Sequence, residues 1–186
     1  DANVTEYHEF INVIQPTIAA YILPKTVDGI GYITRTLEHY PSRGEAIAHI
    51  HIIAHGFPGG LYLGNTELSL TTIAQYGHEL REWFSDFRQQ QAIYPSTSLS
   101  HPYTLPIPQL LLYGCCVAAG DAGAEFLEKL YHHTGAALHA STQPMGNAAM
   151  QGTGTFDTRV GLAKEQASLP AELVTAYSTT LERARA

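Results

Sequence analysis

Two short apolar runs, residues 47–54 and 110–113, constrain the fold of this chain most strongly. Each is four to eight residues long, rich in Ile or Leu, and is followed at once by a glycine beside a reactive side chain. Continuous apolar strands of this length are typical of a parallel sheet that is buried on both faces. The two runs therefore predict neighbouring central strands, and "HIHIIAHG" and "LLLYGC" are the segments that reach the carboxyl end of the sheet.

The rest of the chain alternates between strand and helix patterns, which predicts an α/β fold: a three-layer α/β/α sandwich around a mainly parallel sheet. Asp28 is a predicted N-cap, and apolar residues at helical spacing follow it as far as Pro41. Leu61–Leu63 and Glu67-Leu68 around Gly64-Asn65 predict a hairpin. The further predicted strands are Ala19–Leu23, Ala137–Ala140 and Thr155–Val160, and the further predicted helices are Thr71–Gln91, Ala122–His133 with Gly135 at its end, and Ala171–Arg183.

Length and composition fit one domain over residues 1–186. Hydrophobic residues make up 45% of the chain and charged residues 15%, a balance that argues against disorder. Residues 1–17 are an arm without a clear pattern, in which Phe10–Ile14 is a short strand or packed segment. Residues 95–108 are rich in proline and are expected to form an exposed loop.

Charge and hydropathy argue against two kinds of partner, nucleic acid and the membrane interior. The net charge is -7, and the ten lysines and arginines are scattered along the chain, which disfavours nucleic acid. No apolar run approaches 18 residues, so we expect no membrane insertion.

The chemistry at the sheet edge points to a cysteine nucleophile. His55 precedes Gly56 after the first run, and Cys115 follows Gly114 after the second. If the strands are neighbours, the imidazole can activate the thiol, because the thiolate is the reactive form. The backbone N–H groups of Gly56 and Cys115 would form an oxyanion hole.

Two other interpretations of these residues stay open. A buried cysteine often only packs, and a histidine at a strand end is often a satisfied polar residue. His49, His51 and His55 alternate along one strand face, so with Cys115 they are also candidate zinc ligands. Since no carboxylate motif completes such a shell, we expect no metal and no cofactor.

The segments "HIHIIAHGFPGGLYLGN" and "LLLYGCCVAAGDAGAEFLEKLYHHTGAALHAST" resemble a domain, formerly of unknown function, of very large bacterial surface and repeat-containing proteins. The resemblance runs from about Ala19 to Gly161. In outline the chain is also similar to the caspase-like cysteine peptidases of clan CD and to the self-cleaving cysteine protease domains of bacterial toxins. Those enzymes share an apolar strand ending in His-Gly and a later apolar strand ending in Cys.

The resemblance implies a caspase-like fold with His55 and Cys115 as catalytic dyad and Gly56 as oxyanion donor. It implies loops near Asp28, Ser141–Gly146 and Asp157 as the lining of a substrate pocket. For Asp28 a helix cap, and for Ser141 and Thr142 a turn, are the competing interpretations. It also implies an extracellular or cell-surface location.

Two features depart from these families. Cys116 stands where another residue type, often Asn, is expected; strand alternation predicts that Cys115 is the reactive thiol and that Cys116 points into the protein, with the reverse assignment open. The toxin domains are activated by inositol hexakisphosphate in a basic cleft, whereas this chain is acidic.

The expected function is that of a cysteine endopeptidase that cleaves a peptide bond, foremost in its own parent chain. The alternative is a catalytically silent adhesion or retention module with the same fold. A latent enzyme, blocked by the 95–108 loop or by the N-terminal arm, is a further possibility.

Overall fold

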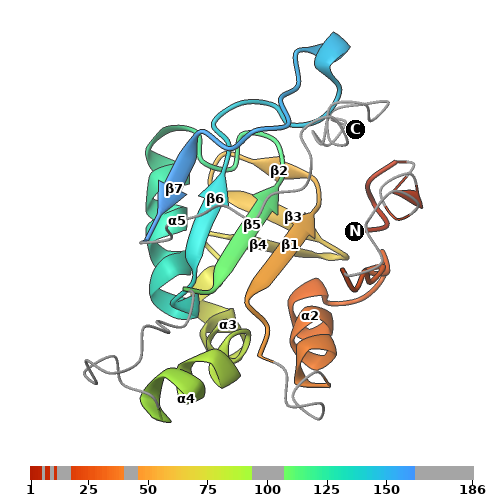
Figure 1. Ribbon diagram of the computed structural model, residues 1–186. Helices are drawn as coiled ribbons and strands as arrows, with labels where there is room; N and C mark the ends of the chain where they lie inside the picture. Colours follow the sequence, from red (N-terminus) through yellow and green to blue (C-terminus); the bar gives the residue numbers. More distant parts are fainter. Residues whose placement is uncertain (6, 9–10, 12–17, 40–45, 94–106, 162–186) are drawn as a thin grey trace.

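The core of the protein is a mainly parallel β-sheet. The computed structural model describes residues 1–5, 7–8, 11, 18–39, 46–93 and 107–161. The strands of the sheet lie in the order β1-β5-β6-β7 (Figure 1). β1, β5 and β6 are parallel, and β7 closes the sheet antiparallel to β6. The α/β class and the mainly parallel sheet are thus confirmed. The bounds are β1 His49–Ile53, β5 Gln109–Tyr113, β6 Ala137–Ala140 and β7 Thr158–Val160.

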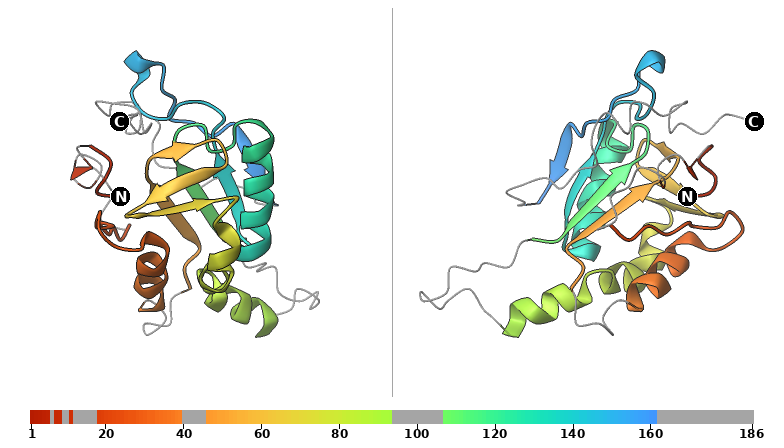
Figure 2. Two further views of the ribbon diagram at one scale, coloured as in Figure 1. Left: turned by 180° about the vertical axis from the view of Figure 1, so that it is seen from behind. Right: turned by 45° about the vertical axis from the view of Figure 1, so that its right-hand side comes forward.

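A second, antiparallel sheet follows β1 directly. It consists of β2 (Gly56–Phe57), β3 (Gly60–Leu63) and β4 (Thr66–Ser69). The predicted hairpin between β3 and β4 is confirmed, and Gly64 takes a φ of 62° at its turn. Figure 2 shows this sheet and α5 on the same side of the main sheet.

One face of the main sheet carries the larger hydrophobic core. Every second residue of the central strands points to it, among them Ile52, Leu112 and Leu138. Because successive side chains of a strand point to opposite faces of the sheet, the residues between these positions face the other side. The core also takes in buried side chains from β3, from α2 (Gly29–Glu38), from α3 (Gly77–Glu82) with its C-cap Trp83, and from α5 (Gly120–Thr134): Ile30, Leu61, Leu63, Leu80, Trp83, Phe126, Leu127 and Leu130.

Local sequence signals explain where the helices begin and end. The Asp28 side chain accepts a hydrogen bond from the Ile30 N–H at 3.1 Å, so the predicted N-cap is confirmed. Gly135 ends α5 in the left-handed region, with a φ of 67°. The helices are α2 Gly29–Glu38, α3 Gly77–Glu82, α4 Ser85–Ile93 and α5 Gly120–Thr134, with 3-10 turns η2 Ile73–Tyr76 and η3 Ala148–Met150.

Two predicted elements are wrong. Residues 19–23 form no strand; Tyr21 and Ile22 are exposed there, and Leu23 accepts a single backbone hydrogen bond from Ala2. The long helix predicted over 71–91 is divided into η2, α3 and α4. α3 ends at Glu82 and α4 begins at Ser85, so the break falls at Trp83 and Phe84, which are both about 2% exposed. The Trp83 indole also donates to Thr34 Oγ1 at 2.9 Å.

Several expectations lie outside the described residues. They are the short strand at 10–14, almost all of the 95–108 loop and the helix at 171–183. Within the described ranges, no helix combines the length and the apolar character needed to cross a bilayer.

Candidate active site

The His-Gly and Gly-Cys dipeptides meet at one end of the main sheet. β1 and β5 are parallel neighbours with Ile53 opposite Tyr113, and each dipeptide follows its strand by one or two residues. A Cβ placed on Gly56 would lie only 2.8 Å from the Cys115 backbone nitrogen. Glycine is therefore needed here to let the two chain segments approach. The predicted adjacency of the two strand ends is confirmed.

The hydrogen bonds of His55 indicate which ring nitrogen carries the proton. Nε2 lies 3.1 Å from the backbone carbonyl oxygen of Asn3, which can only accept a hydrogen bond. The neutral ring therefore carries its proton on Nε2, and Nδ1 holds the free lone pair. Nδ1 is buried and has no hydrogen-bond partner among the residues that the structure describes.

Asn3 is a site residue that the sequence did not reveal. It acts through its backbone carbonyl, so its side-chain type carries no signal of this contact. The Asn3 side chain donates to the Gly64 carbonyl at 2.8 Å, which ties the segment to the β3–β4 turn. Residue-type patterns cannot detect a carbonyl that is placed by tertiary contacts.

The Cys115 thiol is enclosed. Its side chain is about 1% exposed and packs with Val4, Leu111, Tyr113 and Met145. The Met145 N–H donates to Sγ at 3.2 Å, and Sγ donates to the Met145 carbonyl at 3.4 Å. The second contact requires a protonated sulfur, so this geometry describes a resting thiol.

Cys116 differs from its predicted placement. It is half-buried, whereas Cys115 is buried, so the side chain that faces inward is that of Cys115. β5 ends at Tyr113, and strand alternation no longer applies two residues later. Cys116 adopts a φ of 57°, an unusual value for a residue with a side chain, and its N–H donates to the Gln143 carbonyl at 3.0 Å.

Asp28 and Ser141, two of the predicted substrate-binding residues, hold local structure through their hydrogen bonds. Asp28 caps α2 and accepts from Thr66 Oγ1 at 3.1 Å. Ser141 is fully buried, and its oxygen accepts from the Gln143 N–H at 2.9 Å. These contacts agree with the alternative interpretations of a cap and a turn, and the substrate role stays a prediction.

Asp157, the third predicted substrate-binding residue, holds the turn before β7. Its carboxylate accepts from the N–H of Thr142 at 2.8 Å and from the hydroxyl groups of Thr142 and Thr158. Burial raises the pKa of this carboxyl, but the hydrogen bonds outweigh burial and hold it below its ordinary value. Asp157 is thus ionised while it fixes the two ends of the 141–157 segment against each other.

Two histidines, His51 and His139, lie on the site face of the sheet. His51 Nδ1 lies 3.3 Å from the Tyr113 hydroxyl, and His139 is in register with His51 across Leu111. Burial lowers the pKa of both histidines to about 4, with added effects of His49 on His51 and of Arg159 on His139. Across the ranges that the structure describes, no three His, Cys, Asp or Glu side chains are grouped to hold a metal ion.

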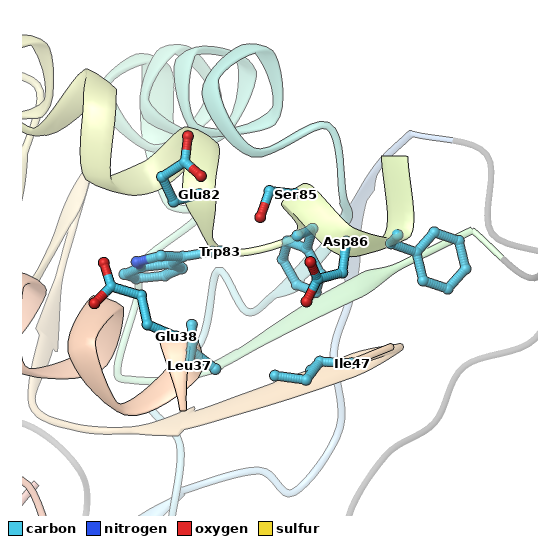
Figure 3. A pocket seen from close by; sticks show the side chains of 9 residues that line it. Leu37, Glu38, Ile47, Glu82, Trp83, Ser85 and Asp86 are labelled. Atoms are coloured by element: carbon cyan, nitrogen blue, oxygen red, sulfur yellow. The ribbon is translucent and has the colours of Figure 1, made fainter. Parts of the chain in front are cut away.

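A shallow hollow of about 150 Å³ lies at the other end of β1 (Figure 3). Ile47, which precedes β1, and Trp83 form part of its lining, and the carboxylates of Glu38, Glu82 and Asp86 stand around it. Since His55 follows the carboxyl end of the same strand, this hollow is separate from the candidate site.

Comparison with known proteins gives a family and no function. No curated protein and no solved structure matches the chain. One family profile matches residues 1–181, which is nearly the whole sequence. The chain therefore belongs to the family described as a domain of unknown function, DUF4347.

Proposed function

We propose that this domain is a cysteine endopeptidase with His55 and Cys115 as its catalytic dyad. The observation that carries the proposal is the meeting of His55-Gly56 and Gly114-Cys115 at one end of adjacent parallel strands. The ring orientation of His55 supports it, since the hydrogen bond from Nε2 to the Asn3 carbonyl leaves the free lone pair on Nδ1. The caspase-like resemblance of the sequence gives the same two residues these roles, and with them a three-layer sandwich.

In the proposed reaction, His55 Nδ1 accepts the thiol proton of Cys115, and the sulfur attacks the scissile carbonyl carbon. The N–H groups of Gly56 and Cys115 stabilise the oxyanion. The tetrahedral intermediate collapses to a thioester as the C–N bond breaks, and His55 returns the proton to the leaving amine. Water, deprotonated by His55, then hydrolyses the thioester and restores the thiol. These reaction steps require no cofactor.

The proposed substrate is a peptide bond of a larger parent polypeptide that contains this domain. That assignment, and the proposed extracellular or cell-surface location, rest on the resemblance to domains of large bacterial surface proteins. Cleavage of a separate protein uses the same chemistry and differs only in how the peptide reaches the sulfur.

The test is processing of the full-length parent chain, measured by the mass and amino-terminal sequence of its fragments. Cys115→Ala is expected to abolish cleavage, and Cys116→Ala, the matched neighbour, is expected to retain it. Both variants should show the circular dichroism of the wild-type domain. Cleavage by Cys115→Ala at the wild-type rate would refute the proposal.

The second candidate is a silent adhesion or retention module of the same fold. The enclosure of Cys115, with both backbone groups of Met145 on its sulfur, favours this candidate. It predicts no fragments from the wild-type parent chain. It also predicts slow alkylation of both cysteines by iodoacetamide at mildly acidic pH even when the sulfur of Cys115 is accessible, where a dyad thiolate would react quickly.

A further inference from the structure

The segment between β6 and β7 returns over the end of the sheet and covers the candidate nucleophile. In Figure 1 it rises above the strand ends and carries η3 at its tip. Met150 at this tip is 55% exposed, whereas Met145 nearer the sheet is fully buried against Cys115. The segment therefore has a buried base and an exposed tip.

The backbone of Met145 forms hydrogen bonds with the sulfur. Its N–H donates to Sγ, and its carbonyl accepts from Sγ, at 3.2 and 3.4 Å. A peptide substrate must bring its carbonyl carbon to the same sulfur. Because Cys115 is about 1% exposed, Met145 and a substrate cannot occupy this position together.

The base of the segment is closed by its own hydrogen bonds. Met145 and Thr153 form an isolated bridge, the Thr153 N–H donates to the Pro144 carbonyl at 2.9 Å, and the Gly146 N–H donates to the Thr153 carbonyl at 3.1 Å. The Gly152 N–H donates to the Asn147 carbonyl at 2.8 Å.

Gly152 fits this closure because it lacks a side chain. A Cβ at Gly152 would lie 2.6 Å from both the carbonyl carbon and the carbonyl oxygen of Gly146, and 2.7 Å from the Asn147 oxygen. These are backbone atoms, so they cannot give way without opening the base of the segment. Closure over Cys115 and the absence of a side chain at Gly152 are therefore linked.

We propose that residues 144–153 form an autoinhibitory strap that holds Cys115 in an inaccessible resting state. This inference concerns the regulation of the same site and rests on the proposed peptidase function. The strap opens at the contact between Gly146 and Gly152, which withdraws Met145 from the sulfur and admits an extended peptide in its place.

The test measures alkylation of Cys115 by iodoacetamide in the folded 186-residue chain. A Cys116→Ala background leaves one thiol, so intact-protein mass reports its labelling rate directly. In native buffer the wild-type strap is expected to keep this rate at least about tenfold below the rate in denaturant, because only the open fraction reacts. Gly152→Ala should raise the native rate about tenfold or more, since its clash favours the open form.

Gly31→Ala is the matched control. A Cβ at Gly31 would approach only the side-chain atoms of Asp28 and Arg35, and α2 is not part of the strap. It should leave the labelling rate unchanged. If Gly152→Ala fails to fold by circular dichroism, Asn147→Ala replaces it, because it removes the side-chain oxygen that accepts the Ala149 N–H at 2.7 Å. Its expected acceleration is in the same direction and smaller.

The outcomes separate the strap from the peptidase. Rapid native labelling of Cys115, unchanged in the strap variants, overturns the strap even if the parent chain is processed. Faster labelling in Gly152→Ala supports the strap. If the parent chain carrying Gly152→Ala is then still not cleaved, the strap stands and the peptidase function fails.

Discussion

The two faces of the central sheet use the same strands for different purposes. Leu112 points to the large core with α5, and its neighbour Leu111 points to the small cluster with Cys115 and Tyr113. The first face is apolar, while the second carries the buried His139, the half-buried His51, a tyrosine hydroxyl and the candidate nucleophile. Strand alternation thus separates the residues that stabilise the fold from those that offer chemistry.

The largest expected effect is the loss of stability on truncating Leu112, which is compared with the loss on truncating Leu111. Both side chains are fully buried, and they occupy adjacent positions of β5. Leu112→Ala should lower the free energy of unfolding by about 3–5 kcal/mol, and Leu111→Ala by about 2–3 kcal/mol, because the cost depends on how far the site can collapse. The small cluster is covered by the strap and by Val4, which can shift into the space. Urea unfolding measures both values, and a larger loss in Leu111→Ala would contradict this division of the sheet.

The next effect concerns His139, the buried histidine of the second face. The pKa of His139 is lowered to about 4 by burial and by Arg159, so the folded state binds this proton less readily than the unfolded state. The free energy of unfolding therefore keeps the full contribution of neutral His139 above the ordinary pKa of about 6.5. This contribution is lost as the pH falls from there towards 4. Thermal unfolding at several pH values should show a steeper loss of stability below pH 6.5 in the wild type than in His139→Phe.

His78 provides a control for this pH dependence, because its side chain is 83% exposed and it lies on α3, away from the second face. His78→Gln should keep the wild-type pH profile. Equal profiles for His139→Phe and the wild type would show that burial of this imidazole does not govern acid stability.

The smallest effect concerns the backbone beside the nucleophile. Cys116 holds a φ of 57°, which glycine adopts without strain. Cys116→Gly should change the free energy of unfolding by no more than about 1 kcal/mol, because relief of strain and greater freedom of the unfolded chain oppose each other. Urea unfolding measures the change, and a loss of several kcal/mol would mean that the Cys116 side chain has a packing role on the second face.

The sequence predicted the fold and the candidate site only in part. The apolar runs located β1 and β5 and the approach of the segment at Gly56 to Gly114-Cys115, because hydrophobic patterns and strand ends are local signals. The patterns overextended the helix at 71–91, because helical spacing of apolar residues does not reveal the breaks at Gly77 and at Trp83-Phe84, and the buried Trp83 indole donates to Thr34 on another helix. The carbonyl of Asn3 and the backbone groups of Met145 escaped prediction, because backbone contacts leave no trace in residue type.

The most direct test of the site is the effect of His55 on Cys115 reactivity once the sulfur is accessible. In the chain carrying Gly152→Ala and Cys116→Ala, alkylation by iodoacetamide is followed at mildly acidic pH, with His55→Ala as the variant and His51→Ala as the matched control. The proposed dyad predicts that loss of His55 slows alkylation of Cys115 about tenfold or more, because the imidazole favours the thiolate, while His51→Ala has little effect. Equal rates with and without His55 would contradict a shared reaction centre.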